Sequence, residues 1–121
     1  MLHENRVFCL AVVPTAAELA EKLIDYTWCL CTGFQLAGSP DTLFVNDSTS
    51  PDGAQEYAVL RRLDGDWFQV ESITFGWIES IEKAAGYIRE AITGAYDSDA
   101  RTWGAFEPRF HEPGEPCIHC C

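Results

Sequence analysis

The densest group of reactive side chains stands at the end of the chain. Three thiols and one imidazole occupy its last five positions: Cys117, His119, Cys120 and Cys121. Thiolates and imidazoles are the ligands that zinc prefers, and His111 could add a further nitrogen. The spacing differs from that of a zinc ribbon or finger, in which two ligand pairs are well separated. The group therefore predicts a zinc site, a disulfide or free thiols, and these alternatives stay open.

The other cysteines offer weaker chemistry. Cys29 and Cys31 stand two apart on a predicted strand, so their side chains point to one face and would suit a redox pair or two metal ligands. They lack the helix N-terminus that acidifies a thioredoxin-type thiol, and unpaired cysteines are usually buried. We expect them, and Cys9, to pack in the core. The three histidines stand near the chain ends, away from these thiols in sequence. No catalytic residue is predicted, and a non-enzymatic role is favoured.

Two carboxylates form a second candidate pair. On the predicted hairpin described below, Glu56 and Glu71 share one face, with Arg62 further along it. Such a pair could serve as general acid and base. Polar residues on the solvated face of an antiparallel sheet look the same in sequence, so we favour that interpretation.

The charge of the chain restricts its partners. Nineteen acids against eight bases give a formal net charge of −11. This charge repels nucleic-acid backbones and anionic membranes, so direct nucleic-acid binding and membrane association are disfavoured. It suits a basic protein partner. No apolar run approaches the roughly 20 residues of a membrane span, and no cleavage site follows the apolar run 7–13, so we expect a cytoplasmic protein with reduced thiols.

Hydrophobic periodicity predicts the elements that would position these residues. The apolar run 6–13 is typical of a strand that is covered on both faces, or at least of a central strand. Thr15 and Glu18 form a capping box, which predicts a helix over 16–26. Apolar residues at helical spacing predict a second helix over 78–92, where Gly86 suggests a close contact. Further strands are predicted at 27–36, 43–46, 55–63 and 67–76.

The strongest turn signal is the Asp-Gly dipeptide at 64–65, which predicts a hairpin between the last two strands. With these two residues in the loop, Val59 is expected opposite Val70, and Tyr57 opposite Ser72. Val59, Val70 and Tyr57 would then share one core face with Phe68.

The predicted fold is α+β, with a mostly antiparallel sheet of about five strands and two helices in the order β-α-β-β-β-β-α. Residues 1–94 form this single domain, with both helices on one face of the sheet. Residues 95–121 contain three prolines and no periodicity. They form an irregular tail that we expect to pack on the domain or on a second subunit.

Aromatic residues on the hairpin and the tail predict an interface if they are exposed, and a sheet covered on both faces is the alternative. They are Trp67, Phe75, Trp77, Trp103, Phe106 and Phe110. The favoured function is that of a small acidic interaction or regulatory protein, homo-oligomeric, which binds another protein and could act as an acidic inhibitor of a basic one. The alternatives are a zinc- or thiol-dependent protein that uses the C-terminal cluster, and a small-molecule-binding domain with a pocket between sheet and helices.

Overall fold

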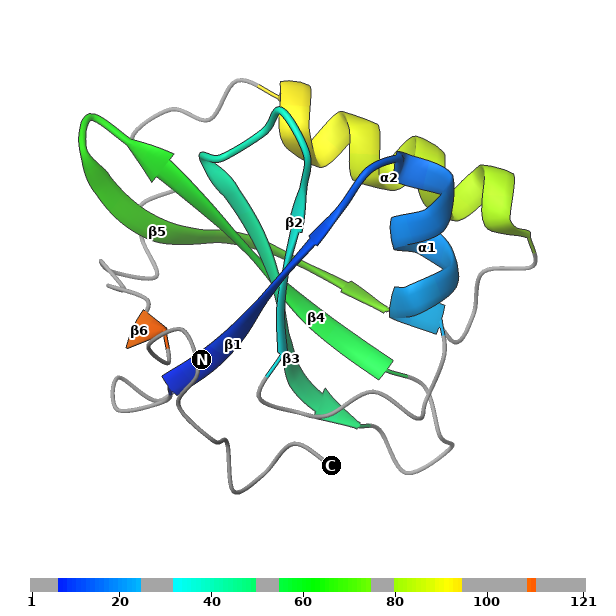
Figure 1. Ribbon diagram of the computed structural model, residues 1–121, viewed down its shortest axis with the longest axis horizontal. Coiled ribbons are helices and arrows are strands. Elements are labelled where there is room, and N and C mark those ends of the chain that lie inside the picture. Colours follow the sequence, from blue (N-terminus) through cyan, green and yellow to red (C-terminus); the bar gives the residue numbers. More distant parts are fainter. Residues whose placement is uncertain (1–6, 25–31, 50–54, 75–79, 95–108, 111–121) are drawn as a thin grey trace.

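A computed structural model describes residues 7–24, 32–49, 55–74, 80–94 and 109–110 (Figure 1). These residues form two helices and a mixed sheet of six strands, so the predicted α+β class is confirmed. The elements in chain order are β1 (Val7–Val13), α1 (Ala16–Ile24), β2 (Thr32–Leu36), β3 (Thr42–Thr49), β4 (Gln55–Leu63), β5 (Asp66–Thr74), α2 (Ile81–Thr93) and β6 (Arg109–Phe110).

The strand order is β5-β4-β3-β2-β1-β6. β1 lies parallel to both β2 and β6, and the other neighbours are antiparallel. The sheet therefore differs from the predicted one, which was mostly antiparallel with about five strands. Two features cause the difference. The chain returns through α1 to lie parallel beside β1, as a helical crossover allows, and β6, inside the predicted irregular tail, adds a further parallel strand.

The helices begin where hydroxyl side chains cap them. The backbone N–H of Glu18 donates to Thr15 Oγ1 over 3.2 Å, as the predicted capping box requires at the start of α1. At the start of α2 the N–H of Lys83 donates to Ser80 Oγ over 3.1 Å, so this helix begins later than the predicted residue 78. A Cβ built at Gly86 meets no atom of the described residues within 4 Å, so the close packing expected at this glycine is not found among them.

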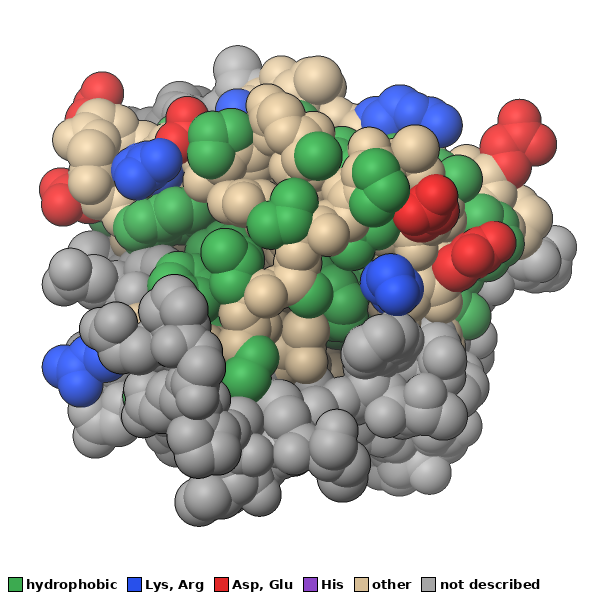
Figure 2. All heavy atoms as spheres, viewed as in Figure 1, with side chains coloured by type: hydrophobic (Ala, Val, Ile, Leu, Met, Phe, Trp, Pro, Cys, Tyr) green, Lys and Arg blue, Asp and Glu red, His purple; other side chains and the backbone are tan. Residues whose placement is uncertain are grey.

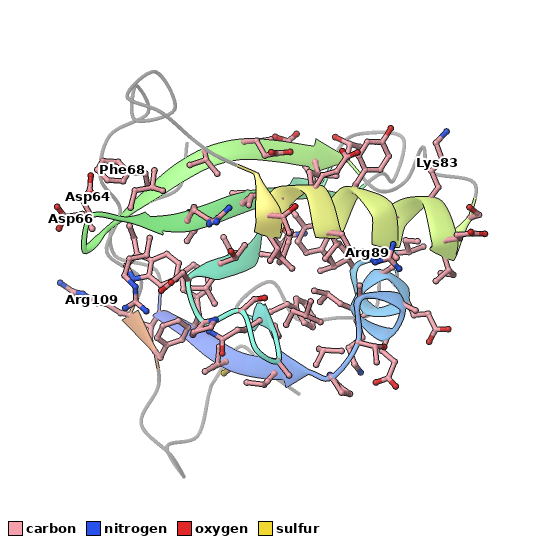
Figure 3. All side chains as sticks on the ribbon, turned by 90° about the horizontal axis from the view of Figure 1, so that it is seen from above. Asp64, Asp66, Phe68, Lys83, Arg89 and Arg109 are labelled. Atoms are coloured by element: carbon pink, nitrogen blue, oxygen red, sulfur yellow. The ribbon has the colours of Figure 1, made fainter. Side chains whose placement is uncertain are left out.

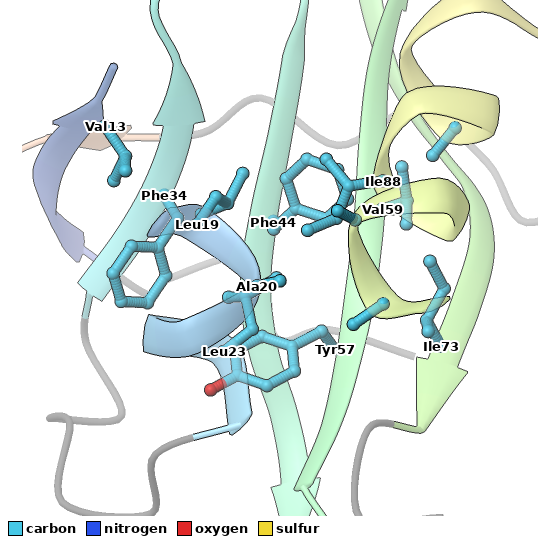
Figure 4. Packing of buried hydrophobic residues seen from close by; sticks show 13 residues of the cluster. Val13, Leu19, Ala20, Leu23, Phe34, Phe44, Tyr57, Val59, Ile73 and Ile88 are labelled. Atoms are coloured by element: carbon cyan, nitrogen blue, oxygen red, sulfur yellow. The ribbon is translucent and has the colours of Figure 1, made fainter. Parts of the chain in front are cut away.

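Both helices pack against one face of the sheet, and Figure 4 shows the side chains between them. From the sheet, Phe34, Phe44, Tyr57 and Val59 meet α1 and α2, with at most 2% of their surface exposed. Each fully buried side chain of this size stabilises the fold by about 1.5–3 kcal/mol. We call this side of the sheet the helix face.

The opposite face of the sheet carries a second buried cluster, which consists of Phe8, Leu43, Val45, Ala58 and Leu60. Two later residues of β1 break this pattern, because Leu10 is 48% and Val12 is 56% exposed. Cover on both faces, one of the two expectations for β1, is therefore wrong for its second half, whereas the alternative of a central strand agrees with its place between β2 and β6. Cys9, expected in the core, is only partly buried.

The hairpin of β4 and β5 turns at the predicted dipeptide. Asp64 and Gly65 both have positive φ, 53° and 89°, as a two-residue hairpin loop with primed geometry needs. Leu63 pairs with Asp66, in agreement with the prediction.

Further from the turn the predicted register is wrong. The register shifts between Val59 and Leu60, and Val70 on β5 has no direct partner on β4. Val59 therefore lies opposite Glu71 rather than Val70. Tyr57 then lies opposite Ile73 rather than Ser72. The reason is a β-bulge, in which one extra residue enters a strand and reverses the facing of all residues beyond it. The bulge turns Ile73 toward the helices, where it joins the core.

Candidate interaction surface

Acidic residues and a tryptophan lie at or next to the turn of the β4–β5 hairpin. We call this surface the hairpin end and define it by Asp41, Arg62, Asp64, Asp66 and Trp67. Asp64 and Asp66 flank the tip of the turn and are exposed. Figure 3 shows them together at one extremity of the molecule. The turn places two acids at the tip because Asp64 tolerates the left-handed backbone that a primed turn requires.

Arg62 connects the hairpin to the neighbouring turn before β3. Its Nε donates to Asp41 Oδ1 over 2.7 Å, and its Nη2 lies 2.6 Å from the same oxygen. Its backbone N–H donates to the carbonyl oxygen of Asp41 over 2.8 Å. The two side chains are 42% and 57% exposed, so the ion pair contributes at most about 1 kcal/mol.

The same guanidinium also contacts Trp67, its direct partner across the two strands. The Arg62 Cζ lies 5.2 Å from the centroid of the indole ring, a cation–π distance. Trp67 is half-buried and packs at the border of the second cluster. The guanidinium of Arg62 therefore contacts the indole ring of Trp67 and forms an ion pair with Asp41. The hairpin end presents three carboxylates against one guanidinium, next to a partly exposed indole.

The predicted interface residues are placed only in part. Trp67 lies at the hairpin end, on the opposite side of the sheet from the core residue Val70, as expected. Phe110 is 38% exposed on β6, where its ring centroid lies 6.4 Å from that of Phe8. The remaining four lie outside the described residues: Phe75, Trp77, Trp103 and Phe106.

The predicted metal ligands also lie outside the described residues. They are His111, Cys117, His119, Cys120 and Cys121. The Cys29 and Cys31 pair also lies outside them. Within the described ranges no three His, Cys, Asp or Glu side chains group as metal ligands would. Zinc binding by the C-terminal cluster stays a prediction.

The two candidate carboxylates do not share a face. Glu71 lies opposite Val59, whose side chain is in the core under the helices. Glu56 alternates with Ala58 and Leu60 along β4, which belong to the second cluster. The bulge at Val70 separates the pair, because it reverses the facing of Glu71. The prediction of a common face is wrong.

Arg61 is a residue whose role the sequence analysis missed. Its Nη1 donates to the carbonyl oxygens of Ala91 and Gly94, each over 2.9 Å. These carbonyls end α2, where a positive charge is favourable. Alternation along β4 already requires one residue of the Arg61–Arg62 pair to face the helices, and this signal was available in the sequence.

Comparisons with known proteins add no further constraint. No family model matches the chain, no curated protein matches its sequence, and no solved structure matches it. Neither of the two described helices has the length and apolar character that crossing a membrane requires. The function must therefore be inferred from the chemistry of the surface.

Proposed function

We propose that the protein acts by binding a basic protein and that the hairpin end is the surface that makes the contact. One observation carries the proposal: Asp64 and Asp66 are exposed at the turn that precedes Trp67 in the chain, while the nearby cation Arg62 is engaged by Asp41. The net charge of −11 acts in the same direction over the whole chain.

The two kinds of side chain at the hairpin end have different tasks in this proposal. Exposed carboxylates attract a basic partner over a distance and raise the rate of association. A partly buried tryptophan supplies contact area, and aromatic anchors dominate the energy of many protein interfaces. Because Arg62 already orients Trp67, less side-chain freedom is lost when a partner binds.

Calorimetry with a peptide of about ten alternating Lys and Gly residues tests the proposal, because such a peptide carries charge without apolar side chains. The double variant Asp64→Asn/Asp66→Asn should weaken binding by about three- to thirtyfold, as expected for two exposed charge contacts. The matched control is Glu21→Gln/Glu90→Gln, which removes the same charge from the exposed faces of α1 and α2. It should change the affinity by less than about twofold.

Salt provides the second arm of the experiment. Raising the ionic strength from about 0.05 M to about 0.5 M should strongly weaken peptide binding by the wild type, because screening acts on exposed charges. Binding that ignores salt contradicts the proposal. Equal losses in the two double variants contradict it as well, because they would mean that only the total charge matters.

A further inference from the structure

The peptide groups of β1 point alternately to its two edges. The carbonyl oxygen of Val13 accepts a hydrogen bond from Ala37 N over 2.8 Å, on the side of β2. The N–H and C=O groups of one strand residue share an edge, and those of the next residue use the other edge. Ala11 and Val13 therefore face β2. Leu10 and Val12 face the opposite edge.

That opposite edge is only partly occupied. β6 pairs there with Val7 and Phe8, and within the described ranges no strand continues beside Leu10 and Val12. Their side chains are also the most exposed large apolar ones in the described part of the chain, at 56% for Val12 and 48% for Leu10. Leu10 and Val12 thus combine exposed apolar side chains with peptide groups on the part of this edge that no described strand occupies.

Phe110 extends this apolar surface. It sits on β6 against Phe8, and its Cε1 lies 3.6 Å from the Cβ position at Gly33. We call Leu10, Val12 and Phe110 the β1 patch. Figure 2, seen from the side on which β1 lies in front in Figure 1, shows hydrophobic side chains across the middle of this face and charged side chains of both signs toward its ends.

Edge strands of soluble proteins usually carry a Lys, a Pro or a bulge that prevents pairing with another chain. The β1 sequence, VFCLAVV, carries no charged residue and no proline. Its pairing with β2 runs through Cys9 to Val13 without a register shift. Beyond its pairing with β6, the sequence of β1 therefore contains none of the features that oppose an added neighbour.

We propose that Leu10–Val12 accept an extended segment of a basic protein as a further strand of the sheet. Backbone hydrogen bonds to Leu10 and Val12 would supply affinity, and apolar residues at alternate positions of the segment would cover the β1 patch. The net charge of −11 disfavours a second copy of this chain and favours a segment whose other residues are Lys or Arg. The surface is separate from the hairpin end, so either proposal can fail alone.

Amide hydrogen exchange, measured by NMR on the full chain, tests the proposal with a seven-residue peptide of alternating Val and Lys. The amides of Leu10 and Val12 should exchange at least about tenfold more slowly when the peptide is bound, because they gain acceptors. The amides of Ala11 and Val13 already face β2 and should change little. Equal protection of all four amides, or none, overturns the proposal.

Two further variants identify the occupant and the contact. Leu10→Thr/Val12→Thr places a β-branched residue with high strand propensity at both exposed positions and should weaken peptide binding by about tenfold through lost apolar contact. N-methylation of alternate peptide residues should abolish binding for the set that faces β1 and spare the other set. Equal binding of both methylated peptides overturns strand addition.

The chemistry of the segment is tested separately. A peptide with Glu in place of Lys should not bind detectably, and equal binding by this peptide overturns the basic partner. A dimer of the protein alone that Leu10→Thr/Val12→Thr dissociates would assign the edge to a second copy, and would overturn the proposed occupant. A loss of binding to the Lys-Gly peptide would concern only the hairpin end.

Discussion

Trp67 of the hairpin end and the β1 patch lie on the same side of the sheet, but the two surfaces differ in the groups that they expose. At the hairpin end the exposed groups are charged, the turn is held by its own backbone geometry, and Arg62 is engaged by two neighbours. At the β1 patch the exposed groups are apolar, and the adjacent strand edge is occupied only beside Val7 and Phe8 among the described residues.

This difference suggests a division of tasks. Exposed charges act at a distance but contribute little once screened by salt, so the hairpin end is suited to attracting a partner. Apolar burial and backbone hydrogen bonds act only over short distances and are insensitive to salt. The β1 patch is therefore suited to retaining a partner that has already bound. The substitutions below separate groups that support the fold from groups that are available to a partner.

The largest expected effect on stability comes from a comparison of one aromatic residue from each region, Phe8 and Trp67. Phe8 is fully buried beneath Phe110, and Phe8→Ala should lower the free energy of unfolding by about 3–5 kcal/mol. Trp67 is only half-buried, so Trp67→Ala should cost clearly less. Urea unfolding measures both. Equal costs would mean that Trp67 is a core residue, which would remove the aromatic part of the proposed contact.

The next effect separates two adjacent arginines. Arg61→Met removes two charged hydrogen bonds to the end of α2 and should cost about 2 kcal/mol. Arg62→Met removes an exposed ion pair and a cation–π contact, and should cost less than about 1 kcal/mol. Thermal unfolding of both variants provides the comparison. A larger cost for Arg62→Met would mean that the hairpin end supports the fold.

The smallest effect compares a glycine from each region. Gly65 has a φ of 89°, so Gly65→Ala should destabilise the fold by about 1–2 kcal/mol. At Gly33 a Cβ would lie 3.5 Å from Phe8 Cβ and 3.6 Å from Phe110 Cε1, which is ordinary contact. Gly33→Ala should therefore change stability by no more than about 0.5 kcal/mol. A large loss at Gly33 would show that Phe110 packs more tightly than the geometry indicates.

Local signals in the sequence predicted the parts of the fold that local physics determines. The spacing of apolar residues located both helices, Thr15 marked the start of α1, and the Asp-Gly dipeptide at 64–65 located the hairpin. The formation of these elements depends on residues that lie within a few positions of each other in the sequence.

The features that were missed depend on distant contacts. The bulge at Val70 is favourable because Ile73 then reaches the core under the helices, a fact of tertiary packing. A continuous apolar run such as β1 does not reveal which of its faces stays exposed. The contact of Arg62 with Asp41 spans 21 positions of sequence, and the sequence analysis did not predict this ion pair.

Chemical-shift mapping by NMR tests the central claim most directly. On titration with the Lys-Gly peptide, the account predicts that the largest shifts occur at Asp64, Asp66 and Trp67, and that Asp64→Asn/Asp66→Asn removes them. Shifts spread evenly over the exposed carboxylates of α1 and α2 would contradict it, because the protein would then act as a diffuse negative charge without a binding surface.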